Sequence, residues 1–170
     1  MTRYLARLML LTASAAAAAS LAAPASAQAE RDETLVQARP TEWAQWRGPH
    51  FDGSSDAKHL PTEFGKEKNL LWTAALPGPS NNTPVVAGGK VFVTAVDPGR
   101  KMVCLALDQA TGKELWRKDA GTAQLRPKGE NDVAAPSPAT DGKRVVFLFG
   151  TGDLLAFDLD GKPLWQRNLQ

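Results

Sequence analysis

The sequence has little of what most catalytic sites are built from. Its 170 residues include one cysteine, Cys104, and two histidines, His50 and His59. A single cysteine excludes an internal disulfide, and because Cys104 lies in the apolar run 102–107 we expect a buried thiol that packs as a small hydrophobic side chain. Neither histidine has a cysteine or a second histidine at metal-ligand spacing, so the sequence predicts no metal centre.

Nucleophilic and phosphate-binding patterns are also missing. The one set of residues that has the residue types of a hydrolase triad is His59 with Asp56 and Ser54 or Ser55. These residues are so close in sequence that we expect a loop there instead of a catalytic site. The segment 150–153 is rich in glycine, but it joins two expected strands and opens no helix, so it predicts a hairpin turn.

Neither sign of charge is in excess. The chain has 20 basic and 18 acidic residues, and two of the basic ones, Arg3 and Arg7, lie in the first 27 residues. The remainder is therefore balanced, with 18 residues of each sign. Nucleic-acid binders normally show a basic excess or patch, so we expect no nucleic-acid partner.

Long apolar runs are absent except at the N-terminus. Residues 1–27 have the pattern of a secretory signal peptide: two arginines, a mostly apolar stretch over 8–23, and an Ala-Ser-Ala cleavage site at 25–27. The apolar stretch is short for a membrane span, and no cysteine follows it that could carry a lipid anchor. We expect a periplasmic or secreted protein with no membrane span.

Short β-strands separated by turn formers make up most of the chain. We expect residues 28–68 to form an N-terminal arm and an irregular lead-in whose tryptophans, Trp43 and Trp46, pack on the domain. The pattern from residue 69 to 170 predicts an all-β domain. The expected strands are 69–75, 83–86, 91–96, 102–107, 114–117, 137–140, 145–149, 154–157 and 163–167.

The expected strands repeat along the chain. Trp116 and Trp165 are 49 residues apart, and Trp72 precedes Trp116 by 44. Units of four strands with a period of 40 to 50 residues indicate a β-propeller. We therefore expect an incomplete propeller of about two four-stranded blades plus one strand, and the Trp72 strand would belong to a further blade.

Each unit ends in a shared motif, ALDQATGKELW at 106–116 and AFDLDGKPLW at 156–165. In each copy we expect an aspartate to cap the hairpin turn, a glycine to supply a positive φ, and a tryptophan to dock on the neighbouring blade. The alternative is that the tryptophans bind a cofactor or a sugar. Because one tryptophan recurs in each blade, a structural role is favoured. The residues are Asp108, Gly112 and Trp116 in the first copy and Asp158, Gly161 and Trp165 in the second.

This motif resembles the PQQ-like repeat of quinoprotein-like β-propellers, and the resemblance covers about 69–170. The lead-in W-x-Q-W-R-G-P at 43–49 is similar to the start of many exported bacterial members. The family includes quinoprotein alcohol dehydrogenases and non-enzymatic relatives such as an outer-membrane assembly lipoprotein. The enzymes need a calcium-binding set, an aspartate base and, usually, a pair of adjacent cysteines. This chain has Cys104 alone, and the acidic residues of its repeats lie in turns.

We therefore expect no catalytic, cofactor-binding or metal-binding residues in these blades. The resemblance implies a non-catalytic exported scaffold that binds a protein or polysaccharide partner. The alternative is the N-terminal part of a PQQ-dependent dehydrogenase, with PQQ and calcium held by other blades. Propellers close with four to eight blades, so we expect this chain to be part of a longer protein, or else to self-associate.

Overall fold

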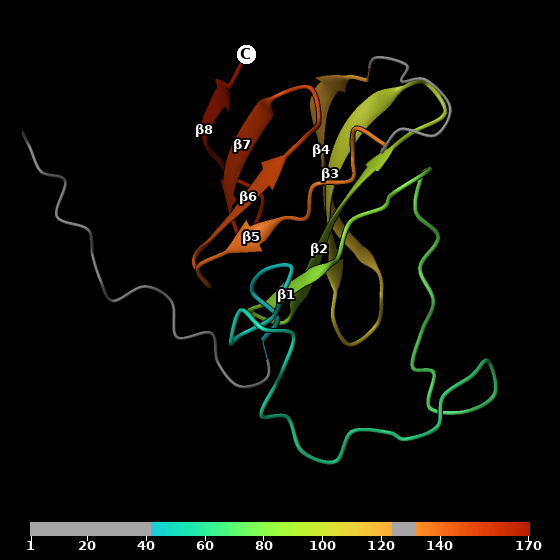
Figure 1. Cartoon of the computed structure of the whole chain (residues 1–170). Coiled ribbons are helices and arrows are strands. Elements are labelled where there is room, and N and C mark those ends of the chain that lie inside the picture. Colours follow the sequence, from blue (N-terminus) through green and yellow to red (C-terminus); the bar gives the residue numbers. More distant parts are fainter. Residues whose placement is uncertain (1–41, 124–131) are drawn as a thin grey trace, which may run out of the picture. The chain divides into compact units, whose positions relative to one another are not determined.

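The computed structural model of the chain describes residues 42–123 and 132–170, and the expected signal peptide at 1–27 lies outside them. The described strands form two four-stranded antiparallel sheets, in the orders β1-β2-β3-β4 and β5-β6-β7-β8 (Figure 1). The prediction of an all-β chain with two four-stranded blades is therefore confirmed. The strands are β1 (Val85–Ala87), β2 (Lys90–Val96), β3 (Lys101–Asp108), β4 (Glu114–Thr122), β5 (Ala139–Thr140), β6 (Arg144–Leu148), β7 (Asp153–Asp158) and β8 (Pro163–Asn168).

The two sheets have the same register, as the repeat in the sequence requires. Ala106 of β3 pairs with Trp116 of β4, and Ala156 of β7 pairs with Trp165 of β8. The register shifts at the next residue in both sheets, so each Trp-bearing strand carries an irregularity at the same position. Such bulges bend a strand and increase its local twist.

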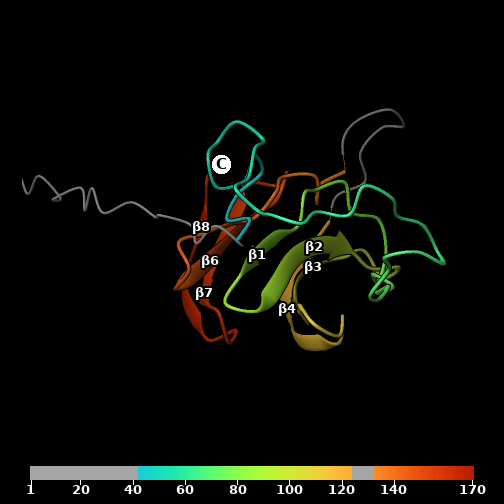
Figure 2. The same ribbon diagram turned by 90° about the horizontal axis from the view of Figure 1, so that it is seen from below.

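One hydrophobic core lies between the two sheets, which sit next to each other in Figure 2. Its centre consists of Phe92, Trp116, Phe147 and Phe157, and the centroids of rings in contact are 5.7 to 6.4 Å apart. Phe92 and Phe147 are fully buried. Aromatic rings in tilted and edge-to-face arrangements contribute about 0.5–1.5 kcal/mol per pair beyond the apolar area they bury. These rings therefore join the two blades into one packed unit.

Hydrogen bonds join the blades beside this core. The Asn82 side-chain Nδ2 donates to the backbone oxygens of Thr94, at 3.1 Å, and Ala134, at 3.0 Å. The Thr83 backbone N–H donates to Ser137 Oγ at 2.9 Å. The segment before β1 is thereby fixed to the segment before β5.

The segment 69–75, which we expected to be a strand, forms no β-ladder with any described strand. Its apolar, β-prone composition is a local property, whereas a strand also needs a partner with free backbone groups. None of the eight described strands pairs with it. Trp72 nevertheless makes a specific contact with the first blade.

Candidate functional site

The lead-in is attached to the first strand of both blades. Trp43 and Val86 of β1 exchange two backbone hydrogen bonds, at 3.0 and 2.8 Å. The next residue, Ala44, accepts a hydrogen bond from the Thr140 N–H of β5 at 2.9 Å. In Figure 1 the lead-in is the cyan segment beside β1 and β5. It therefore bridges the two sheets, which the sequence did not predict.

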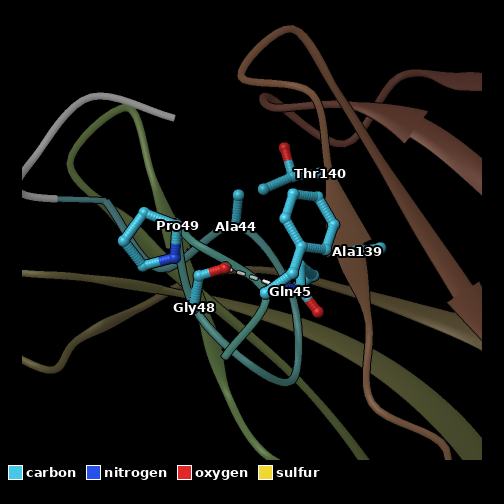
Figure 3. A pocket seen from close by; sticks show the side chains of 7 residues that line it. Ala44, Gln45, Gly48, Pro49, Ala139 and Thr140 are labelled. Carbon is cyan, nitrogen blue, oxygen red and sulfur yellow. Dashed lines mark hydrogen bonds between the residues drawn. The ribbon is translucent and has the colours of Figure 1, made fainter. Parts of the chain in front are cut away.

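Residues 45–53, here called the lead-in loop, are held by their own hydrogen bonds. Gly48 N–H donates to the Gln45 backbone oxygen at 2.9 Å, and Gln45 Nε2 donates back to the Gly48 oxygen at 2.6 Å (Figure 3). Gly48 has a φ of 72°, and a Cβ added there would lie 2.7 Å from the Trp43 ring. Only glycine combines this backbone conformation with this close approach to Trp43, so a larger residue at position 48 would displace the Trp43 ring.

A mainly apolar pocket of about 150 Å³ lies where the lead-in loop meets β5 (Figure 3). Both the loop and the blade contribute to its wall, so the pocket depends on the bridge described above. Its lining residues are Ala44, Gln45, Gly48, Pro49, Phe51, Ala139 and Thr140.

The lead-in loop exposes two aromatic side chains, of which Phe51 lines this pocket. Trp46 is 64% exposed and Phe51 is 66% exposed. The expectation that both lead-in tryptophans pack on the domain was therefore wrong for Trp46. Trp43 pairs with β1, whereas Trp46 lies in the turn that leaves the sheet, where Arg47 approaches its ring at 5.9 Å. Phe51 has a φ of 60°, which is uncommon for a bulky residue.

Polar residues of the lead-in make local contacts and do not form a triad. Asp56 pairs with His50 at 2.9 Å and not with His59. Ser54 donates its hydroxyl and its N–H to Asp52, at 2.7 and 2.8 Å. The Ser54 hydroxyl, followed by its N–H, holds the pKa of Asp52 below the usual value. The hydrolase triad considered from the sequence, His59 with Asp56 and Ser54, is therefore not assembled in the structure.

The repeated aspartates lie in the hairpin turns. Asp108 Oδ1 accepts hydrogen bonds from the N–H groups of Ala110 and Thr111, at 3.1 and 2.8 Å, and from the Thr111 hydroxyl at 2.7 Å. The Thr111 hydroxyl, followed by the Thr111 N–H, lowers the pKa of Asp108. Asp158 accepts from two backbone N–H groups of its own turn, at 3.0 and 2.8 Å. Both carboxylates therefore organise turns.

Trp116 covers the glycine of the second blade's turn. Gly161 has a φ of 83°, and a Cβ added to it would lie 2.9 Å from the Trp116 ring. Trp116 Nε1 donates to the backbone oxygen of Leu159, the residue after the capping aspartate, at 3.0 Å. The Trp116 side chain therefore contacts the turn in two ways: its ring packs against Gly161, and its indole N–H binds the Leu159 carbonyl.

Trp72 makes the same contact with the first blade. Gly112 has a φ of 70°, and a Cβ added to it would clash with the Trp72 ring. Trp72 Nε1 donates to the oxygen of Gln109 at 2.9 Å, again the residue after the capping aspartate. The sequence predicted a strand at Trp72, and the 44-residue distance from Trp116 was the signal of this docking position. Trp165 of β8, the third tryptophan of the series, is 41% exposed.

The described residues do not fit the calcium site of a quinoprotein enzyme. Calcium takes six to eight oxygen ligands, but within 42–123 and 132–170 no three histidine, cysteine or acidic side chains come together as a metal site would require. Cys104 is buried, and burial raises the pKa of its thiol. In the same residues no helix is long and apolar enough to cross a membrane.

Comparison with known proteins places the chain in a family. A family model described as outer membrane protein assembly factor BamB matches residues 64–170, more than half of the chain. No curated protein matches the chain. The crystal structure of BamB from Moraxella catarrhalis is 24% identical, with a TM-score of 0.42, over 58% of this chain and 26% of that one.

A europium-containing methanol dehydrogenase is 21% identical, with a TM-score of 0.53, over 81% of this chain and 25% of that one. The chain thus spans about a quarter of the length of both solved chains. The likeness to the dehydrogenase concerns the fold alone. The match to the family model, over two blades with the repeated Asp, Gly and Trp positions, shows that this chain belongs to the PQQ-like repeat β-propeller family described as outer membrane protein assembly factor BamB.

Proposed function

We propose that this chain is part of an exported, non-catalytic β-propeller scaffold that binds a protein partner outside the cytoplasm. The observation that carries the proposal is the lead-in loop, which exposes Trp46 and Phe51 on a framework fixed by hydrogen bonds. Large aromatic side chains on a rigid loop bind partners at low conformational cost.

The backbone of Phe51 supports a binding role. A bulky residue at positive φ costs on the order of 1–3 kcal/mol, and such strain concentrates at functional sites. The strained residue here does not fill a core, because its side chain is mostly exposed. It also lines the apolar pocket against β5, where a partner's aliphatic or aromatic side chain would fit.

The description of the matched family model favours a protein as the partner. That description names an outer membrane protein assembly factor, whose task is to act on other proteins. Polysaccharide is the second candidate, because exposed aromatic rings also stack on sugars. In both cases the partner would meet the chain after export, which agrees with the signal peptide expected at 1–27.

The test is site-specific crosslinking in living cells. A photoreactive amino acid replaces Phe51, and a second protein carries it at Leu60, an equally exposed apolar residue of the same lead-in. We expect a crosslinked, protease-sensitive product from position 51 that is lost with Trp46→Ala. A protease-resistant product would point to polysaccharide, and no product from position 51, or the same product from position 60, would overturn the proposed site.

The second candidate function is the N-terminal part of a PQQ-dependent dehydrogenase. One observation favours it, the fold shared with a methanol dehydrogenase over 81% of this chain. The PQQ and calcium ligands would then come from residues other than those described. Purified protein is incubated with PQQ and Ca²⁺ and assayed for quinone absorbance and dye-linked alcohol oxidation. Both signals together would refute the scaffold proposal.

A further inference from the structure

A second hollow, of about 350 Å³, lies between the outer parts of the two blades. The two sheets approach each other most closely at β1 and β5, so they diverge toward β4 and β8 and leave a space between them. One wall of this space comes from β4, and the other comes from β7 and β8. We name it the interblade groove, and its lining includes Lys118, Asp119, Leu155, Phe157, Leu164 and Gln166.

Side chains from both walls point into the interblade groove. Lys118 pairs with Cys104 across β4 and β3, and Cys104 belongs to the core between the blades. Gln166 pairs with Leu155 across β8 and β7, and Leu155 belongs to the same core. Directly paired residues of neighbouring strands have their side chains on one face of the sheet. Lys118 therefore faces the second blade, and Gln166 faces the first.

The floor of the interblade groove is apolar. Leu155 and Phe157 are core side chains that are almost fully buried, and Leu164, which lines the same groove, is 43% exposed. An apolar side chain placed over these residues would remove more of their surface from water. Such burial is favourable in proportion to the apolar area that is covered.

Lys118 gives the groove a positive charge that nothing nearby neutralises. Its stem packs on the second blade, because a Cβ added to Gly161 would lie 3.1 Å from Lys118 Cε. Within 42–123 and 132–170 its ammonium group has no ion-pair or hydrogen-bond partner. Asp119, the acidic residue of the lining, pairs instead with Lys101 at 2.9 Å. The groove therefore offers one fixed cation above an apolar floor.

We propose that the interblade groove binds an extended peptide segment of a partner protein, in which a carboxylate lies next to apolar side chains. The carboxylate pairs with Lys118, and the apolar side chains cover Leu155, Phe157 and Leu164. β4 is an edge strand of nine residues without proline, so its outer backbone groups can pair with the peptide. This surface is separate from the lead-in loop and does not depend on the function proposed above.

The groove would remain open in a longer propeller. It lies between the facing sides of the first and second blades, so both of its walls belong to described strands. Further blades of a propeller would pack on the two opposite faces. A hollow of about 350 Å³ takes a few side chains and not a folded domain, and this favours a peptide segment as the occupant.

The test is fluorescence anisotropy with a labelled peptide that alternates threonine and leucine around one central glutamate. A matched peptide has glutamine in place of the glutamate. We expect the purified chain to bind the glutamate peptide about 3- to 5-fold more tightly, the upper range for a partly exposed ion pair. Lys118→Gln should remove this preference and leave the affinity for the glutamine peptide unchanged.

Two further variants identify the position of the peptide. Arg167→Gln is the matched control, because Arg167 follows Trp165 by two residues as Lys118 follows Trp116, but Arg167 does not line the groove. This variant should keep the preference for glutamate. Gln166→Glu places a carboxylate on the wall opposite Lys118, where it competes with the peptide, and should weaken binding of the glutamate peptide. Gln166 and Arg167 are both exposed, so neither change disturbs the core.

Three results would overturn the proposal. The first is equal affinity for the two peptides, or no binding of either. The second is that Arg167→Gln loses the preference as Lys118→Gln does, which would show unspecific attraction to positive charge. The third is that Trp46→Ala abolishes binding, which would move the peptide to the lead-in loop. Protection of the buried Cys104 thiol from alkylation shows that each variant is folded, and if Lys118→Gln is not, Gln166→Glu decides.

Discussion

At the scale of single residues, the glycines of the repeated turns serve two purposes at once. Gly161 has a positive φ and also leaves space for the Trp116 ring. Gly89, in the turn between β1 and β2, has a similar φ of 73°, but a Cβ added to it would meet no atom within 4 Å. Alanine variants of Gly161 and Gly89 would both carry the free-energy cost of backbone strain, but only the variant of Gly161 would also displace Trp116.

We expect Gly161→Ala to destabilise the chain more than Gly89→Ala. Both changes force an alanine to positive φ, at a cost of about 1–3 kcal/mol. Gly161→Ala also pushes Trp116 off the turn and weakens its hydrogen bond to Leu159. Urea denaturation of the two variants measures the difference, and equal losses would contradict a docking role for Trp116.

A second prediction at this scale concerns pH. The pKa of Asp108 lies below its ordinary value of 3.8 because the Thr111 hydroxyl and N–H donate to the carboxylate. A carboxyl whose pKa is lowered by folding stabilises the folded state above its unfolded pKa. That contribution is lost as the pH falls below about 3.8 and through the folded pKa.

Asp108→Asn should therefore flatten the fall in the free energy of unfolding below about pH 4. Denaturation curves at a series of pH values measure the slope. Thr111→Val removes the larger of the two causes and should reduce the slope part of the way. An unchanged slope in both variants would show that the Asp108 turn does not contribute to acid sensitivity.

At the scale of elements, the strands of both blades followed from local sequence. The run 91–96 is β-branched and apolar and became β2, and the motif at 156–165 became β7, its turn and β8. Segment 69–75 has similar composition but forms no strand, because pairing depends on a neighbour that composition cannot reveal. The lead-in bridge was also not predictable, since Trp43 and Ala44 show no strand alternation.

The link between the blades gives a prediction about Asn82. Asn82→Ala removes hydrogen bonds to Thr94 and Ala134, and because the Thr94 hydroxyl still donates to the Ala134 carbonyl, the cost should be about 0.5–1.5 kcal/mol, the net range for a typical hydrogen bond. Cys104 lies in the core between the blades, so its alkylation rate reports their separation. The rate should rise in Asn82→Ala and remain unchanged in Asn81→Ala, where the side chain is exposed. Equal rates would show that other contacts hold the blades together.

At the scale of the whole molecule, the shared core predicts cooperative unfolding. The core cluster contains residues of both sheets, and Trp116 packs against Phe92 of one blade and Phe157 of the other. We expect circular dichroism and tryptophan fluorescence to give the same denaturation midpoint. Trp116 is partly buried, so Trp116→Ala should lower stability by somewhat less than the roughly 3–5 kcal/mol typical of fully buried aromatic truncations.

Trp46→Ala is the control for that change, and it should alter stability by less than about 0.5 kcal/mol because the side chain is exposed. Two separate transitions in the unsubstituted chain would show that each blade folds alone. The candidate site was harder to predict from the sequence than this core. Its exposed aromatics could be found only from the structure, because the sequence shows where tryptophans are but not which of them a turn carries outward.

The docking of Trp72 and Trp116 on the hairpin turns has a consequence for how such chains can grow. Trp72 and Trp116 contact the turns of the first and second blade in the same way, so the two described docking steps follow one rule. A gene segment that encodes one blade could therefore be duplicated in frame, and the new blade would find a partner on both sides without any change in sequence.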